Sequence, residues 1–73
     1  MFSHHKKYPC PCCGLLTLDE KPPGTYDICP TCGWEDDPVQ YRQPDFAGGA
    51  NELSLNEARA RFERLRHEAD KAQ

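Results

Sequence analysis

The sequence predicts a small α+β domain that is stabilised by a bound metal ion rather than by a large hydrophobic core. Three observations support this fold class: a repeated cysteine motif, a chain of only 73 residues, and one stretch with the apolar periodicity of a helix near the C-terminus. We expect a flexible N-terminus over residues 1–7 and a single domain over residues 8–73. Within this domain, residues 8–33 form the cysteine motifs and a hairpin, residues 34–53 an ordered connector, and residues 54–71 the helix.

The repeated motif is Cys-x-x-Cys-Gly, with proline after the first cysteine in both copies. The copies, called here the first knuckle (residues 10–14) and the second knuckle (residues 29–33), leave fifteen residues between Cys13 and Cys29. This spacing is typical of a four-thiolate zinc site, and the glycine relieves crowding where backbone N–H groups turn toward the sulfurs. We therefore expect one Zn²⁺ per chain, with iron as the alternative metal. The predicted ligands, called here the cysteine quartet, are Cys10, Cys13, Cys29 and Cys32.

The fifth cysteine, Cys12, occupies a variable position of the first knuckle. A turn that directs its first and fourth residues at an ion points the third side chain elsewhere, so we expect Cys12 to be an unreactive residue of a tight turn. The alternative is a reactive thiol close to a cation, whose oxidation would release the metal.

Chain length and composition favour a metal-dependent fold. The sequence has three Phe, one Trp and three Tyr, and chains of this size commonly need a metal, disulfides or oligomerisation for stability. A structural zinc ion supplies folding free energy directly. No apolar run could span a bilayer, residues 1–7 lack the apolar core of a signal peptide, and an odd number of cysteines fits disulfide pairing poorly. We therefore expect a cytoplasmic protein without a membrane-bound segment.

The charge of the chain is concentrated in its middle. The formal net charge is −3, but the segment from Asp19 to Glu52 contains eight carboxylates against Lys21 and Arg42, a net of −6. Proteins that bind nucleic acids neutralise phosphates with Lys and Arg, so this acidic field opposes a nucleic-acid partner.

Two short β-compatible segments flank a turn-rich loop. Residues 15–18 and 25–28 lie on either side of a loop that contains Pro22-Pro23-Gly24, and this arrangement predicts a β-hairpin that returns the second knuckle beside the first. A metal between two knuckles at one end of a hairpin is the arrangement of a zinc ribbon. The predicted fold is therefore a zinc-ribbon β-hairpin.

The connector begins with a helix-start signal. Asp37, followed by Pro38, is typical of an N-cap with proline in the first turn, and Pro44 limits the helix to one or two turns. We expect the carboxylates of residues 35–37 to form a capped, solvated turn rather than a second metal or acid–base site. The Gly48-Gly49 pair permits positive φ angles.

The C-terminal segment reads as an amphipathic helix. Ser54 and Glu57 form a capping box that marks its start. An apolar stripe follows at intervals of three or four residues, formed by Leu55, Ala58, Phe62, Leu65 and Ala69. We expect the stripe to pack within the domain against aromatic and aliphatic connector residues, leaving the acidic outer side of the connector as the candidate partner surface. The connector residues expected to cover it are Trp34, Val39, Tyr41 and Phe46.

From Tyr8 to about Arg59 the chain resembles the cysteine-rich CPCC domain family, small and largely bacterial proteins named for the string Cys10-Pro11-Cys12-Cys13. The resemblance extends to residues 26–30, 32–38 and 48–51, to Ser54-Leu55 and to residues 57–59. It implies a metal-binding fold and includes Cys12 in the family's string, but it implies no particular activity. The knuckles alone are also similar to those of rubredoxin-like zinc ribbons.

These observations predict a small structural-zinc protein that acts as a protein-interaction module and is not an enzyme. Four thiolates complete a tetrahedron and leave no open coordination position, and the sequence contains no other catalytic constellation. Two alternatives remain: a rubredoxin-like electron carrier with iron at the same four cysteines, and a zinc-ribbon nucleic-acid binder. The expected oligomeric state is a monomer or weak dimer.

Overall fold

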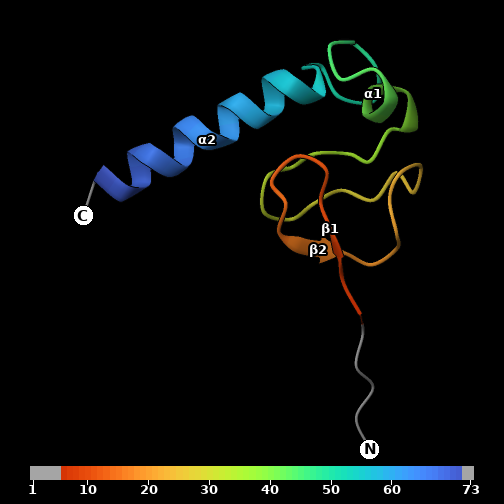
Figure 1. Ribbon diagram of the computed structural model, residues 1–73, viewed down its shortest axis with the longest axis horizontal. Coiled ribbons are helices and arrows are strands. Elements are labelled where there is room, and N and C mark those ends of the chain that lie inside the picture. Colours follow the sequence, from red (N-terminus) through yellow and green to blue (C-terminus); the bar gives the residue numbers. More distant parts are fainter. Residues whose placement is uncertain (1–5, 72–73) are drawn as a thin grey trace, which may run out of the picture.

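The computed structural model describes residues 6–71, which form a small α+β structure (Figure 1). Strands β1 (Tyr8–Pro9) and β2 (Leu16–Leu18) are followed by the short helix α1 (Pro38–Arg42) and the long helix α2 (Leu55–Lys71). Figure 1 shows α2 extending away from the folded region that contains the other elements. Neither helix in this part of the chain has the length and apolar character needed to cross a membrane. The expected flexible N-terminus falls largely outside the described residues, as do residues 72 and 73.

The two strands form an antiparallel hairpin around the first knuckle. Tyr8 lies opposite Leu18 and Pro9 opposite Leu16, with an irregularity in the register between the two pairs. The prediction that residues 15–18 pair with residues 25–28 is therefore wrong. Tyr26, with a φ of 58°, departs from the extended conformation that a strand requires, so residues 25–28 do not form a regular strand beside residues 15–18.

The second knuckle lies within a shorter pairing of the same kind. Ile28 and Glu35 form an isolated antiparallel bridge. On one side of it the Cys29 N–H donates to the Trp34 carbonyl at 2.9 Å, and on the other the Asp36 N–H donates to the Asp27 carbonyl at 3.0 Å. Each knuckle is thus enclosed by its own pair of extended arms.

The hydrophobic core lies beside the knuckles. Trp34, from the connector, packs in it with an exposure of 3%. Because two of the buried residues belong to the cysteine quartet, the metal-ligand candidates are themselves a large part of the core. The buried members of this cluster are Cys10, Leu18, Cys29, Trp34 and Leu55.

The connector is ordered mainly by buried polar groups. Helix α1 begins as predicted, with Asp37 as N-cap accepting from the backbone N–H groups of Val39 and Gln40, and it ends before Pro44. The fully buried Gln40 side chain donates to the carbonyl oxygens of three loop residues at 3.0–3.1 Å. Its carbonyl oxygen accepts from both the backbone and the side chain of Asn51. A glutamine thus takes the central place that we expected apolar side chains to fill.

The expected second hydrophobic core is absent from the described residues. Val39, Tyr41 and Phe46 are 41–47% exposed, and of the expected connector residues Trp34 is the buried one. The expectation of a solvated acidic turn is also wrong, because Asp36 and Asp37 are buried. Both carboxylates accept backbone hydrogen bonds, Asp36 from Thr25 and Asp37 from Ala50, which offsets the cost of removing them from water.

Helix α2 begins with the predicted capping box. The Glu57 N–H donates to the Ser54 hydroxyl oxygen at 3.1 Å, and the Ser54 N–H donates to the Glu57 carboxylate at 2.9 Å. Leu55 is buried in the core, but the helix then leaves the folded region, and Leu65 is 47% exposed. The connector therefore covers only the start of the apolar stripe.

Candidate metal centre

The two knuckles have nearly the same backbone geometry. In each, the glycine N–H donates to the carbonyl of the first cysteine at 2.8 Å, from Gly14 to Cys10 and from Gly33 to Cys29. Both glycines have positive φ angles, 78° for Gly14 and 83° for Gly33, in the left-handed region that favours glycine. The repeated sequence motif thus produces a repeated turn that presents two cysteines on one side.

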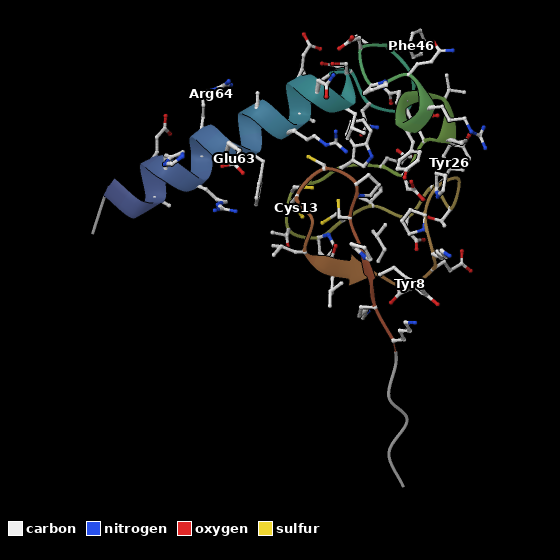
Figure 2. The ribbon with its side chains drawn as sticks, in the orientation of Figure 1. Tyr8, Cys13, Tyr26, Phe46, Glu63 and Arg64 are labelled. Atoms are coloured by element: carbon white, nitrogen blue, oxygen red, sulfur yellow. The ribbon has the colours of Figure 1, made fainter. Side chains whose placement is uncertain are left out.

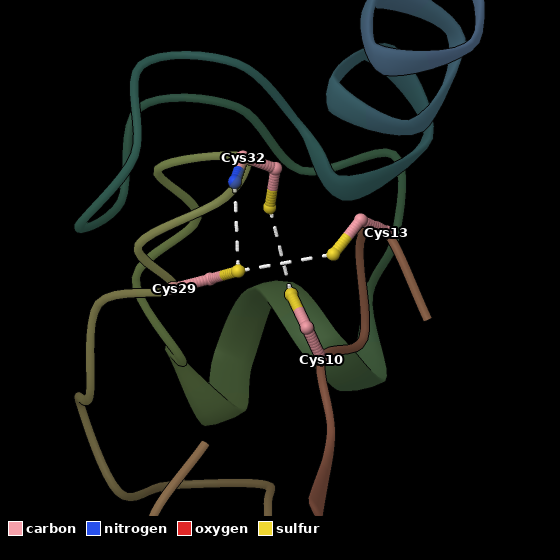
Figure 3. Close-up of side chains that lie close together, drawn as sticks. All are labelled: Cys10, Cys13, Cys29 and Cys32. Carbon is pink, nitrogen blue, oxygen red and sulfur yellow. Dashed lines mark hydrogen bonds between the residues drawn. The ribbon is translucent and has the colours of Figure 1, made fainter. Parts of the chain in front are cut away.

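The two turns face each other and bring the cysteine quartet together (Figure 3). All four Sγ atoms lie within 4.8 Å of one another, with Cys10–Cys32 at 3.6 Å and Cys13–Cys29 at 3.7 Å. A tetrahedral zinc with Zn–S bonds of about 2.3 Å separates its sulfurs by about 3.8 Å. The spacing and the chemistry of these four donors therefore fit a single metal ion, and each close pair joins one cysteine from each knuckle.

Burial differs within the quartet. Cys10 and Cys29, the first cysteines of their knuckles, are buried, whereas Cys13 and Cys32 are partly exposed. The inner side of the site packs against the hydrophobic core, and its outer side lies close to the protein surface.

Hydrogen bonds converge on the sulfur of Cys29. The backbone N–H groups of Thr31 and Cys32 donate to it at 3.4 and 3.5 Å, and the Thr17 hydroxyl lies 3.0 Å away. In the first knuckle the Cys12 N–H donates to the Cys10 sulfur at 3.4 Å. Donors of this kind stabilise negative charge on thiolates and tune a bound metal.

These surroundings separate the pKa values of the quartet. Burial alone would raise the pKa of Cys29, but the hydrogen bonds from Thr17, Cys32 and Thr31 together lower it to about 6. Burial raises the pKa of Cys13 to about 11, and the neighbouring Cys10 adds to this effect. Burial, with hydrogen bonding and charge from Cys10, also raises the pKa of Cys32. Without a cation the site thus favours the thiolate of Cys29 and disfavours those of Cys13 and Cys32, which a bound cation would have to stabilise.

Cys12 lies outside the four-sulfur cluster, beside a groove that runs along α2. Its side chain is partly buried, and burial raises the pKa of its thiol. Burial thus disfavours the Cys12 thiolate when no cation is bound, and the alternative of a thiol activated by a bound metal stays a prediction.

Two contacts around the site were not predicted from the sequence. Thr17 was read only as part of a β-compatible segment, yet its hydroxyl contacts the Cys29 sulfur. Arg59 of α2 donates from Nε to the Pro11 carbonyl at 2.9 Å and so attaches the helix to the first knuckle. No local pattern signals either contact, because the partners are separated by 12 and 48 residues.

The family profile described as Cysteine-rich CPCC matches residues 8–70, and the chain therefore belongs to this family. The match extends further along α2 than the resemblance described above, which reached about Arg59. A search of characterised proteins gave no significant match.

Proposed function

We propose that this member of the Cysteine-rich CPCC family binds one zinc ion through its cysteine quartet and that the ion has a structural role. The observation that carries the proposal is the placement of four sulfurs within 4.8 Å of one another, with one pair at 3.6 Å and another at 3.7 Å. Four thiolates fill a tetrahedral site and leave no position for water or substrate, so a catalytic role for the ion is not proposed.

A structural role is supported by how little else holds the knuckles together. The buried apolar cluster has few members, and two of them, Cys10 and Cys29, are ligand candidates. Sulfur atoms of different knuckles lie within 3.7 Å of each other, so a metal bound by all four cysteines would cross-link the two knuckles. Structural zinc contributes about 10–16 kcal/mol of apparent binding free energy, which is large compared with the stability of a small domain. The paired knuckles are also consistent with a rubredoxin-like zinc ribbon.

Native mass spectrometry tests this proposal. Protein purified without added metal should carry one zinc per chain, and removal of the zinc by a strong chelator should abolish the far-ultraviolet circular dichroism of the folded state. Return of both signals on addition of one equivalent of zinc would support a structural site. Retention of the fold after complete loss of metal would contradict it.

A second candidate is electron transfer by iron at the same four cysteines. The observation that favours it is the partial exposure of Cys13 and Cys32, together with the N–H donors on Cys10 and Cys29, because exposure and hydrogen bonds to sulfur set the potentials of iron–thiolate sites. Protein from iron-supplemented cells would then be coloured and would bleach on reduction. We expect colourless protein.

The proposed biological role is protein binding. The connector exposes Tyr41 and Phe46 together with the carboxylates of Asp45 and Glu52, and a surface that mixes aromatic and acidic groups suits a partner with basic and apolar side chains. Affinity purification from the source cells, with metal content measured on the same sample, tests this role. A Tyr41→Ala variant should retain its zinc and lose the partner. Binding of duplex DNA with a steep salt dependence would instead favour the nucleic-acid alternative.

A further inference from the structure

Most of helix α2 has no covering element in the described structure. Beyond Leu55 and Ala58 the apolar stripe continues through Phe62, which is partly buried, to Leu65, which is 47% exposed. Large apolar side chains are unfavourable in water, and helices in proteins gain most of their stability from packing of an apolar face. The stripe therefore lacks a partner that its sequence pattern predicts.

The uncovered stripe faces a groove. The groove has a volume of about 880 Å³ and lies between α2 and the knuckle region, where Cys12, Trp34 and Leu53 line it. From α2 it is lined by the apolar Phe62 and Leu65 and by Arg61, Arg64 and Arg66. Figure 2 shows the side chain of Arg64 directed away from the knuckle region, although the residue also borders the groove. The side of α2 that lacks cover is thus the concave side of the molecule.

Charged residues lie on both borders of the stripe. Their order along the helix would place opposite charges next to each other if a second α2 packed against the stripe in the antiparallel direction. Arg61 and Glu68 lie on one border, two turns apart, because seven residues make nearly two turns of an α-helix. In an antiparallel, two-fold symmetric pair the same border of each helix meets its equivalent, so Arg61 of one copy meets Glu68 of the other, and the reciprocal pair forms as well.

The border on the other side of the stripe carries Arg59, Glu63 and Arg66. Its charges give the same alignment. When Arg61 lies opposite Glu68 of the second copy, Glu63 lies opposite Arg66 of that copy. Glu63 and Arg66 have side chains that are more than half exposed and are 3.9 Å apart within one helix, so they can reach outward. Arg59, which shares this border, donates to Pro11 in its own chain. In a parallel pair, by contrast, Arg61 would meet Arg66 of the second copy, and the like charges would repel each other.

We propose that a second copy of this chain occupies the groove and that the protein forms an antiparallel dimer through α2. In the charge-matched alignment, Phe62 of one copy packs near Leu65 of the other. Because α2 extends beyond the folded region (Figure 1), the two knuckle regions lie at opposite ends of the helix pair. The dimer goes beyond the proposed zinc function and does not depend on which metal the quartet holds.

Sedimentation equilibrium of the zinc-loaded full chain provides the first test. The expected result is a concentration-dependent mass that rises from 8.3 kDa toward twice that value, with dissociation in the micromolar range that is typical of small interfaces. Leu65→Asp should weaken association by at least about tenfold, whereas Ala60→Asp, which places the same residue on the opposite face of α2, should change it by less than about threefold. A wild-type chain that stays monomeric at millimolar concentration would overturn the proposal.

A charge-exchange experiment tests the identity of the occupant and the alignment. Arg61→Glu alone places like charges opposite each other at both ends of the interface, and so does Glu68→Arg alone. Each variant should therefore associate on the order of tenfold more weakly than the wild type.

An equimolar mixture of the two variants provides the rescue. In the mixed dimer the two substituted side chains lie opposite each other with their charges exchanged, and the unchanged Arg61 and Glu68 form the second pair. Both contacts then join opposite charges, so association should return to within about threefold of the wild type. Failure of the mixture to recover, with one zinc per chain in both variants, would overturn the antiparallel alignment.

Discussion

The side-chain amide of Asn51 pairs with both backbone groups of Glu35. Its Nδ2 donates to the Glu35 carbonyl at 2.8 Å, and its Oδ1 accepts from the Glu35 N–H at 2.8 Å. The Ile28–Glu35 bridge leaves these two groups directed away from the Ile28 arm, because the hydrogen bonds of the bridge run through the neighbouring residues. Asn51 therefore takes the place of a third strand beside the second knuckle and joins the end of the connector to it.

This arrangement predicts that Asn51→Ala is strongly destabilising. The substitution leaves the Glu35 N–H and carbonyl without their partner and also removes a donor from Gln40 Oε1. Unsatisfied buried groups cost about 1–3 kcal/mol each, so we expect the free energy of unfolding to fall by about 2–4 kcal/mol. Denaturant unfolding of the zinc-loaded wild type and variant measures this loss of stability. Asn56→Ala is the control, because Asn56 makes an exposed bond to Asp45, and its effect should stay within about 0.5 kcal/mol.

The cysteine quartet predicts a contrast between two neighbouring thiols. Cys13→Ser removes one of the four clustered sulfurs, so we expect loss of stoichiometric zinc and of the folded-state circular dichroism. Cys12→Ser should keep one zinc per chain, because Cys12 lies outside the cluster. Native mass spectrometry and zinc analysis of both variants check the contrast. Equal loss of zinc in the two variants would show that the ligand assignment is wrong.

Gly49 is required for close packing rather than for its backbone conformation. A Cβ atom at this position would lie 2.7 Å from Asp37 Oδ2 and 3.0 Å from Gln40 Cδ, and both of these side chains are buried. Gly49→Ala should therefore lower the free energy of unfolding by about 1–3 kcal/mol.

Gly48 offers the matched comparison for this prediction. It has a φ of 84° but open space around its Cα, and asparagine tolerates that conformation better than other residues. Gly48→Asn should therefore destabilise the protein less than Gly49→Asn in the same denaturation experiment. The reverse order would contradict the close-packing argument.

The features that the sequence predicted correctly are those encoded within a few neighbouring residues. The knuckles, the Asp37 cap with Pro38, and the Ser54–Glu57 capping box each depend on residues at most four apart, and the structure contains all of them. Their geometry follows from local turn and capping chemistry, and little else in the fold is needed to form them.

The features that the sequence did not predict depend on contacts between distant residues. The strand partner of residues 16–18 was misassigned because Tyr8 and Pro9 are too short a segment to carry a strand signal, whereas residues 25–28 have a β-compatible sequence. The buried polar network around Gln40 was missed because composition suggested an aromatic second core. A second core built on the apolar stripe would predict that Phe62→Asp releases the connector. Since Gln40 and Asn51 hold the connector, we now expect it to stay ordered in this variant.

The carboxylate of Asp37 gives the connector a dependence on pH. The backbone N–H of Ala50 donates to Oδ2 at 3.0 Å, and this bond, with those from Val39 and Gln40, outweighs burial and lowers the pKa of Asp37 below its ordinary value of 3.8. A carboxyl whose pKa is lower in the folded state stabilises that state when it is ionised. Its contribution is complete above the unfolded-state pKa and is lost as the pH falls through the folded-state pKa.

Asp37→Asn should therefore destabilise the protein most at neutral pH. The amide can still cap α1, but it replaces a charged acceptor with a neutral group at the Ala50 N–H, so we expect a loss of about 1–2 kcal/mol in the free energy of unfolding at pH 7. The difference from the wild type should shrink as the pH falls below about 4, where the wild-type carboxyl begins to take up a proton. Denaturant unfolding of both proteins at saturating zinc, from pH 7 down to the lowest pH at which both still fold, measures this difference. Glu52→Gln is the control, because it neutralises an exposed carboxylate of the same connector and should change stability by less than about 0.5 kcal/mol throughout. A difference between Asp37→Asn and the wild type that grew as the solution became more acidic would contradict the assignment of Asp37 as an ionised cap.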